Sequence, residues 1–299
     1  MTALRQASPA RAQSLIESQF KTAREKTQRL GETLVQLGKI DTATANRIES
    51  ERRKTGGLFG QTAVRMGLIT KTELQFALGV LLGILHEKPE PKHIPSDLVM
   101  VSKPYSKEAE QIRSLRGHLS TGISEDALSL FALTGAEEGS CAFYMAANLA
   151  ASFAAIGRRV LVIDANLRRP MLAKILGEPR ALGLSDVVAG FVPYEDACSG
   201  TMVKNLDLLA AGKAAPDPQA ILGTLQFRNL LERARGDYDI VIVLTTPFGT
   251  AADCEFVWSS AKRILVVARK DHSRVDDLAR IHMAIRRTNS EAIGAAMVV

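Results

Sequence analysis

Short, uninterrupted runs of apolar residues recur along the last two thirds of the chain. The runs are rich in Val, Ile and Leu, and helix-like stretches separate them. Strands buried on both faces have this continuous apolar pattern, and intervening helices allow parallel pairing. The runs are Leu130–Gly135, Arg159–Ala165, Leu206–Gly212, Asp239–Pro247, Arg263–Arg269 and Ile293–Val299. We therefore predict an α/β fold with a doubly wound, mostly parallel sheet.

Three stretches between these runs have the spacing of helices. Ala146–Ile156 is rich in small residues and stops at Gly157. Gln219–Arg235 and Val275–Arg287 repeat apolar residues every three or four positions. Because this spacing places apolar side chains on one side of a helix, we expect these helices to cover the sheet.

The first third of the chain contains an internal repeat. Leu30–Ile40 (LGETLVQLGKI) and Phe59–Ile69 (FGQTAVRMGLI) align at an offset of 29 residues. Each copy predicts a short helix, a glycine that takes the left-handed conformation, and an N-cap residue that opens a second helix. These are Glu32–Leu37, Gly38 and Asp41 in the first copy, and Gln61–Met66, Gly67 and Thr70 in the second. The repeat predicts a small helical module.

Composition divides the chain into four parts. Residues 1–28 form a basic arm that we expect to be partly disordered, although such a run can also attract an anionic lipid surface or a phosphate ligand. Residues 29–85 hold the two-repeat module. Residues 86–105 contain four prolines and no helical period, which predicts a semi-extended linker. Residues 106–299 form the α/β domain.

Charge, apolar runs and cysteine content indicate the cellular compartment in which the protein works. The net charge of +6 comes from residues 1–104, which hold 16 Lys and Arg against 10 Asp and Glu. No apolar run reaches the roughly 18 residues that a membrane span needs. The first residues do not resemble a signal peptide. Cys141, Cys198 and Cys254 have no metal-like spacing, so we expect small buried side chains in a reducing cytoplasm.

The N-terminal repeats resemble those of the N-terminal domain of type II secretion and pilus assembly ATPases. The likeness rests on the two LGxxLVxxGxI-like segments and on the link Thr55–Gly60 (TGGLFG). Some members of that family bind cyclic di-GMP through an Arg that opens each repeat and a Gln near its end. Here only Arg29 matches, because Leu58 replaces the second Arg, and Arg52 and Leu81 replace the Gln residues. We favour a docking module for a second protein and keep cyclic di-GMP binding through Arg29 as an alternative.

The α/β part resembles the bacterial tyrosine kinase domains that work with polysaccharide co-polymerases. The likeness extends from about Tyr105 to Val299 and implies a P-loop NTPase-like fold. It rests on four ordered motifs: VLVIDANLRRP (Val160–Pro170), GLSDVVAG (Gly183–Gly190), LDLLAAG followed by APDP (Leu206–Pro218) and YDIVIV (Tyr238–Val243).

The resemblance implies that the loop after Leu130–Gly135 corresponds to the phosphate-binding loop of the family. In that loop backbone amides and a Lys hold the phosphates, and a hydroxyl holds magnesium. The counterparts here are Gly139, Cys141, Ala142 and Phe143, so the family's last glycine, lysine and serine are replaced. We expect Cys141 to disfavour a positive backbone angle, and Glu137 and Glu138 to add negative charge.

The family's acidic metal-binding residues are reduced as well. Asp164 and Asn166 align with two aspartates that follow the second strand, and Leu244 aligns with the aspartate of the later Walker B strand. Asp164 is therefore the residual acidic site. The alternative is that Asp164 only caps a strand end and that Arg168 and Arg169 form surface ion pairs.

A helix ahead of the sheet keeps the spacing ExxRxxR. Glu110, Arg113 and Arg116 lie on one side of this helix, and in related kinases the same spacing joins subunits into a ring. We expect an oligomer or ring through these residues. The alternative is pairing within the helix at i, i+3.

These observations predict a non-catalytic, pseudokinase-like regulator or scaffold of exopolysaccharide or capsule biosynthesis and export. Without the lysine, the hydroxyl and two carboxylates we expect no ATP, magnesium or other metal, and no catalytic residue. The expected partners are a membrane polysaccharide co-polymerase (chain-length regulator), further copies of the chain and a second protein at residues 29–85, with no nucleic acid. The expected location is cytoplasmic, at the inner face of the bacterial inner membrane through a partner.

Three alternatives stay open. A residual ATPase or protein-tyrosine kinase of the same pathway would use a rearranged loop. A cyclic di-GMP-responsive receptor would sense its ligand through the N-terminal repeat. A partitioning protein of the MinD or ParA type would share the fold, but APDP at Ala215–Pro218 and the ExxRxxR helix favour the polysaccharide branch.

Overall fold

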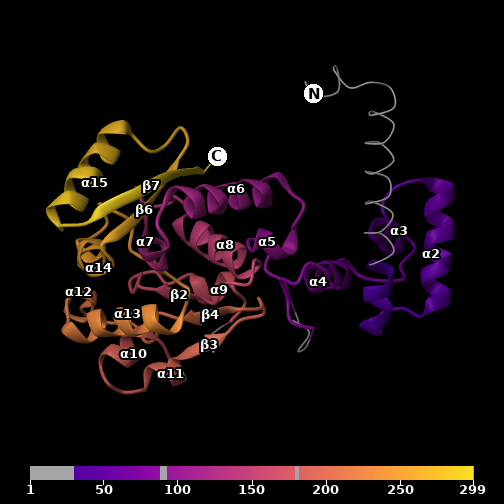
Figure 1. Cartoon of the computed structure of the whole chain (residues 1–299), viewed down its shortest axis with the longest axis horizontal. Coiled ribbons are helices and arrows are strands. Elements are labelled where there is room, and N and C mark those ends of the chain that lie inside the picture. The colour runs from indigo at the N-terminus through magenta and orange to yellow at the C-terminus, as the bar shows by residue number, and fades with distance from the viewer. Residues whose placement is uncertain (1–29, 88–92, 179–181, 299) are drawn as a thin grey trace. The chain divides into compact units, whose positions relative to one another are not determined.

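The computed structural model describes residues 30–87, 93–178 and 182–298, and the chain folds into two compact units (Figure 1). The N-terminal unit extends to Gly83, and the α/β unit contains Ile84–His86 and the residues after the gap at 88–92. The predicted arm at residues 1–28 and Arg29 lie outside the described residues. Among the described helices, none is long and apolar enough to cross a membrane.

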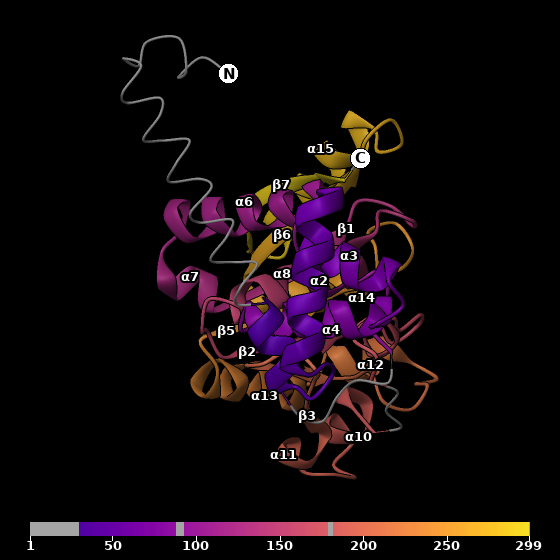
Figure 2. The ribbon, with the colours of Figure 1, turned by 90° about the vertical axis from the view of Figure 1, so that its right-hand side faces the viewer.

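The N-terminal unit consists of helices, which appear in indigo and violet in Figure 2. A helix covering residues 30–36 comes first, and Gly38 and Gly67 have φ angles of 67° and 68°. Asp41 accepts a hydrogen bond from the Thr44 N–H, and Thr70 forms a capping box with Glu73. These glycine stops and N-caps confirm the predicted repeat. The named helices are α2 (Thr42–Thr55), α3 (Phe59–Arg65) and α4 (Lys71–Leu81).

The glycines that open each repeat permit close packing between helices. A Cβ atom at Gly31 would lie 3.3 Å from the Phe59 ring, and one at Gly60 would lie 2.4 Å from Leu74 Cδ1. Gly60 therefore cannot carry a side chain without a shift of Leu74. Around them, Leu34 and Ile48 are fully buried in the small apolar core of this unit.

Part of the predicted linker belongs to the α/β unit. Helix α5 (Val99–Ser102) is buried over its whole length, and just before the predicted linker Leu85, the last residue of the predicted repeat module, forms a single bridge with Val203. The Met100 N–H donates to Asn148 Oδ1 at 3.1 Å. The prediction of an extended linker up to residue 105 is wrong for this half, because its apolar residues pack on the sheet domain.

The sheet has seven strands in the order β3-β4-β2-β5-β1-β6-β7. All neighbouring pairs are parallel except β3 and β4, which pair antiparallel at one edge. This arrangement confirms the predicted doubly wound, mostly parallel sheet. The strands are β1 (Leu130–Gly135), β2 (Val160–Asp164), β3 (Cys198–Gly200), β4 (Leu206–Leu209), β5 (Ile240–Leu244), β6 (Arg263–Arg269) and β7 (Glu291–Val298).

Helices cover both faces of this sheet (Figure 1). Helix α8 packs on strands β1, β2 and β5 with α6 outside it, while α13 and α14 pack on the opposite face. Gln219–Arg235, predicted as one helix, is split into α12 and α13 because Thr224 caps a new helix after Gly223. The helices are α6 (Lys107–Gly122), α7 (Glu125–Ser129), α8 (Ala142–Ala154), α9 (Leu172–Ile175), α10 (Leu184–Val188), α11 (Tyr194–Ala197), α12 (Pro218–Leu222), α13 (Leu225–Asp237), α14 (Asp253–Ala261) and α15 (Val275–Arg287).

Candidate functional site

The loop between β1 and α8 lies where doubly wound sheets bind ligands, at the carboxyl ends of the central strands. Its start is fixed by backbone hydrogen bonds, from Ala136 N–H to the Val267 carbonyl and from Phe248 N–H to the Gly135 carbonyl. A Cβ atom at Gly135 would lie 1.9 Å from Ser140 Oγ, so the loop folds tightly back on the strand end.

The backbone of this loop has the curled form that can surround an anion. Gly139 has φ 87°, and Cys141 has φ 60° and ψ 27° directly before the first residue of α8. The expectation that Cys141 avoids a positive φ is therefore wrong. The left-handed region costs a residue other than glycine roughly 1–2 kcal/mol, which the fixed loop ends and the following helix offset.

The side chains of the loop are acidic and apolar. Glu137 accepts a hydrogen bond from Ser273 Oγ at 2.6 Å, and Glu138 forms an ion pair with Arg169. Ala142 is buried at the start of α8, and Phe143 follows it at a half-buried position. Residues 136–145 include no Lys or Arg. The loop itself therefore supplies two carboxylates and no cation, and the cations beside it include Arg169, which pairs with Glu138, and Arg269, whose Nη1 would lie 3.9 Å from a Cβ atom at Gly139.

Asp164 at the end of β2 holds the next loop together. Its Oδ2 accepts hydrogen bonds from the Met171 and Leu172 N–H groups, both at 2.9 Å, and its Oδ1 accepts one from the Asn166 N–H at 3.2 Å. Burial raises the pKa of Asp164 to about 6, although the three N–H groups act in the opposite direction. These contacts are those of a strand-end cap. The described residues contain no group of three His, Cys, Asp or Glu side chains that could hold a metal.

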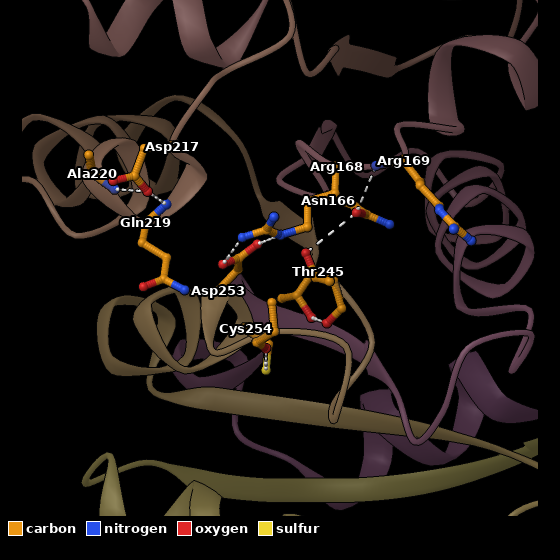
Figure 3. A network of polar contacts seen from close by, with 11 residues as sticks. Asn166, Arg168, Arg169, Asp217, Gln219, Ala220, Thr245, Asp253 and Cys254 are labelled. Carbon is orange, nitrogen blue, oxygen red and sulfur yellow. Dashed lines mark hydrogen bonds and ion pairs between the residues drawn. The ribbon is translucent and has the colours of Figure 1, made fainter.

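An ion pair connects the loop after β2 to the start of α14 (Figure 3). Arg168 donates to both carboxylate oxygens of Asp253, at 2.5 and 3.1 Å, and Asp253 is almost fully buried at the start of α14. The Arg168 side chain points toward Asp253, whereas Arg169 extends away from it. Ion pairs of both arginines, which the sequence left open as an alternative, are present, but sequence reasoning missed Asp253, whose only local signal is its place in the first turn of an apolar helix.

Asn166 connects this loop to the end of β5. Its Oδ1 accepts hydrogen bonds from the Arg169 N–H at 3.2 Å and from Thr246 Oγ1 at 3.4 Å. Leu244, aligned with Asp164 across the β2–β5 pair, is buried. The loops after β2 and β5 are therefore joined by uncharged contacts.

The cysteines differ in exposure. Cys254 is buried, and burial raises the pKa of its thiol to about 12. Cys141 and Cys198 are only partly buried, so the prediction of three buried cysteines holds for Cys254 alone.

The ExxRxxR residues of α6 have partners within the chain. Arg113 donates to Glu110 Oε2 at 2.7 and 3.1 Å and to the Pro104 carbonyl at 2.9 Å. Arg116 donates to the Ser152 carbonyl of α8 at 2.7 Å, and burial lowers its pKa. The pairing within the helix, which the sequence left open, is therefore present for Glu110 and Arg113.

Two cavities lie near the residues singled out in the sequence. One of about 790 Å³ lies between α6, the start of α8 and the end of β7, and Cys141, Phe143 and Met297 help to line it. The other, of about 530 Å³, lies in the N-terminal unit and is lined partly by Glu32 and Glu49. Arg29, the candidate contact for cyclic di-GMP, cannot be placed beside this cavity because it lies outside the described residues.

No model of a protein family matches the chain. The tyrosine-protein kinase wzc of Salmonella typhimurium is 30% identical over 204 residues, which are 68% of this chain but only 28% of that kinase. The tyrosine-protein kinase YwqD of Bacillus subtilis is 28% identical over 201 residues, which are 67% of this chain and 85% of that kinase.

Solved structures agree with these sequence matches. The kinase domain of the Escherichia coli tyrosine kinase ETK superposes with a TM-score of 0.65 at 27% identity, covering 69% of this chain and 81% of that domain. The chimerical protein CapA2B2 gives a TM-score of 0.64 at 24% identity, covering 74% of this chain and 96% of the other.

The α/β unit thus has a P-loop type of fold with a crevice at the carboxyl ends of its strands. It belongs to the domain family of the bacterial tyrosine kinases. Since the chain spans little more than a quarter of the length of wzc, the activity and partners of such whole proteins enter only as proposals.

Proposed function

We propose that this chain is a non-catalytic, pseudokinase-like regulator or scaffold in exopolysaccharide or capsule biosynthesis and export. The observation that carries the proposal is the chemistry of the β1–α8 loop. Its side chains offer two carboxylates, one bound to Ser273 and the other to Arg169, and residues 136–145 supply no cation. A magnesium-bound triphosphate needs the opposite charge at this place.

The remaining groups of the crevice support the same proposal. Phosphoryl transfer depends on positioning and on electrostatic stabilisation by cations and metal ions. Asp164 is occupied by three backbone N–H groups, Leu244 has no polar atom on its side chain, and Asp253 is paired with Arg168. Losing one group that stabilises a transition state typically costs about 10²–10³ in rate, so several losses together leave little catalysis.

A residual ATPase or tyrosine kinase is the second candidate, and one observation favours it. Gly139 and Cys141 keep positive φ angles in front of a helix of 13 residues, which is the backbone arrangement of an anion-binding loop. In this alternative the backbone alone would bind the nucleotide.

The partner that we propose is a membrane polysaccharide co-polymerase, which would hold the chain at the inner face of the bacterial inner membrane. The similarity to the chimerical protein CapA2B2 supports such a pairing. For residues 29–85, which resemble the N-terminal domain of secretion ATPases, we propose a second protein partner. The cavity of this unit is lined by Glu32 and by Glu49, whose carboxylate pairs with Arg52 and Arg53, so Arg53 at this cavity already has an anionic partner within the chain.

Titration calorimetry with Mg-ATP tests the central proposal. We expect no heat of binding for the natural chain and clear binding for the ETK kinase domain as a positive control. The matched variant Ala142→Lys/Phe143→Ser, combined with Glu137→Ala, restores the cation and the hydroxyl and removes a carboxylate. Magnesium-dependent binding at micromolar concentration by the natural chain, followed by transfer of phosphate to tyrosine, would establish the second candidate.

A further inference from the structure

The last strand of the sheet presents an open edge. β7 pairs on one side with β6, and within the described residues no strand pairs with its other side. Ala292–Val298 contain no charged residue and no proline. Natural proteins usually protect such edges with lysine, proline or a bulge. The one register shift between these two strands leaves Ile293 of β7 as an extra residue between Ala292 and Gly294, and Gly294–Val298 beyond it pair with β6 in regular register.

Exposed apolar side chains accompany this edge. Met297 on β7 is 65% exposed, and Val275 and Met283 on α15 are 80% and 63% exposed. Helix α15 contacts β7, and both elements lie together at one end of the sheet (Figure 1). A strand edge beside apolar side chains is typical of a surface that receives another strand.

The distribution of charge on α15 favours a strand that comes from a second copy of this chain. The first turn of this helix holds Asp276 and Asp277, and the last turn holds Arg286 and Arg287. If a second copy is related by a two-fold axis, its α15 lies antiparallel to the first, and each acidic end meets a basic end. A patch that complements itself in this way has the property required of a two-fold interface.

We propose that β7 pairs antiparallel with β7 of a second copy of this chain, joining two sheets into one, with the two α15 helices side by side. The interface differs from the ring expected through α6, and it does not depend on whether the chain binds nucleotide. In the described structure Arg113 and Arg116 of α6 are bound to groups of their own chain, whereas the outer edge of β7 is open.

Sedimentation equilibrium of the full chain tests this pairing. We expect a mass of two chains for the natural protein. We expect Ala295→Lys and Met297→Lys to raise the dissociation constant at least about tenfold, as like charges across an interface do. The matched control Phe191→Lys replaces an apolar residue that is 78% exposed in the segment between α10 and α11, and we expect it to leave the dimer unchanged. Circular dichroism verifies that each variant is folded.

A charge exchange on α15 tests the two-fold geometry. Asp276→Arg and Arg286→Asp each weaken the dimer, and the double variant Asp276→Arg/Arg286→Asp restores it, because both ends are reversed together. A natural chain that stays monomeric at every concentration would overturn the proposal. So would an oligomer that survives Met297→Lys but is lost in Arg113→Glu, since that result assigns self-association to α6.

Discussion

Replacing Asp164 by asparagine separates a structural role of this carboxyl group from a metal-binding one. The buried carboxyl group has a pKa of about 6 against an ordinary value of 3.8. Because the folded-state pKa lies above the unfolded one, the native protein binds more protons between these two pH values. The stability that the protonated Asp164 carboxyl group adds to the folded protein is fully present below about pH 3.8, and it is lost as the pH rises through about 6.

The size of the effect follows from the same two values. Because the folded and unfolded pKa values differ by about 2, the contribution of Asp164 to the free energy of unfolding falls by about 3 kcal/mol from the acidic to the basic end of this pH range. The amide introduced by Asp164→Asn would keep one carbonyl oxygen for Met171 and Leu172, but its NH2 group would face the Asn166 N–H, a loss of about 1 kcal/mol. We therefore expect Asp164→Asn to be about 1 kcal/mol less stable than the natural chain at low pH and about 2 kcal/mol more stable above pH 7.

Urea unfolding of both proteins across this pH range measures the difference, with Asp196→Asn at an exposed position as the matched control. Magnesium is then added to each protein. A stability difference that does not change with pH would refute the assignment of Asp164 as a buried cap with a raised pKa. Stabilisation of the natural chain by magnesium, absent in Asp164→Asn, would show instead that Asp164 is a metal ligand.

Two further substitutions test contacts that the sequence did not reveal or only implied. Arg168→Met leaves the buried Asp253 carboxylate without its cation, and we expect a loss of about 1–3 kcal/mol in urea unfolding; an unchanged midpoint would remove this ion pair from the stabilising contacts. Gly60→Ala places a Cβ atom 2.4 Å from Leu74 Cδ1, and we expect it to lower the free energy of unfolding by about 1–3 kcal/mol. The control Gly117→Ala, in open space on α6, should raise the free energy of unfolding by up to about 1 kcal/mol. Equal effects of the two substitutions would contradict the close packing of the repeat.

The sheet could be predicted from the sequence because its strands are buried on both faces. β1 and β6 begin and end where their apolar runs do, and α15 matches its predicted bounds. The turns of the repeat were also predictable, since Gly38 and Gly67 permit a positive φ that other residues avoid. In both cases the deciding interactions are local or depend only on overall burial.

The parts that sequence reasoning missed depend on distant partners. β3 has three residues, and only its pairing with β4 makes it a strand. Arg168 and Asp253 are 85 positions apart, and nothing near either residue identifies the other. Cys141 takes a left-handed conformation that its own preference opposes, because the strand before it and the helix after it fix the path of the chain.

The shape of the β1–α8 loop is therefore a poor indicator of chemistry. The loop is held by the Ala136 and Phe248 N–H groups and by the narrow space at Gly135, none of which involves a phosphate-binding side chain. Such a loop keeps its curl after its lysine and hydroxyl have been replaced, because the supporting bonds belong to the sheet. It follows that restoring a lysine at position 142 alone should not restore binding while the Glu137 and Glu138 carboxylates remain at the loop.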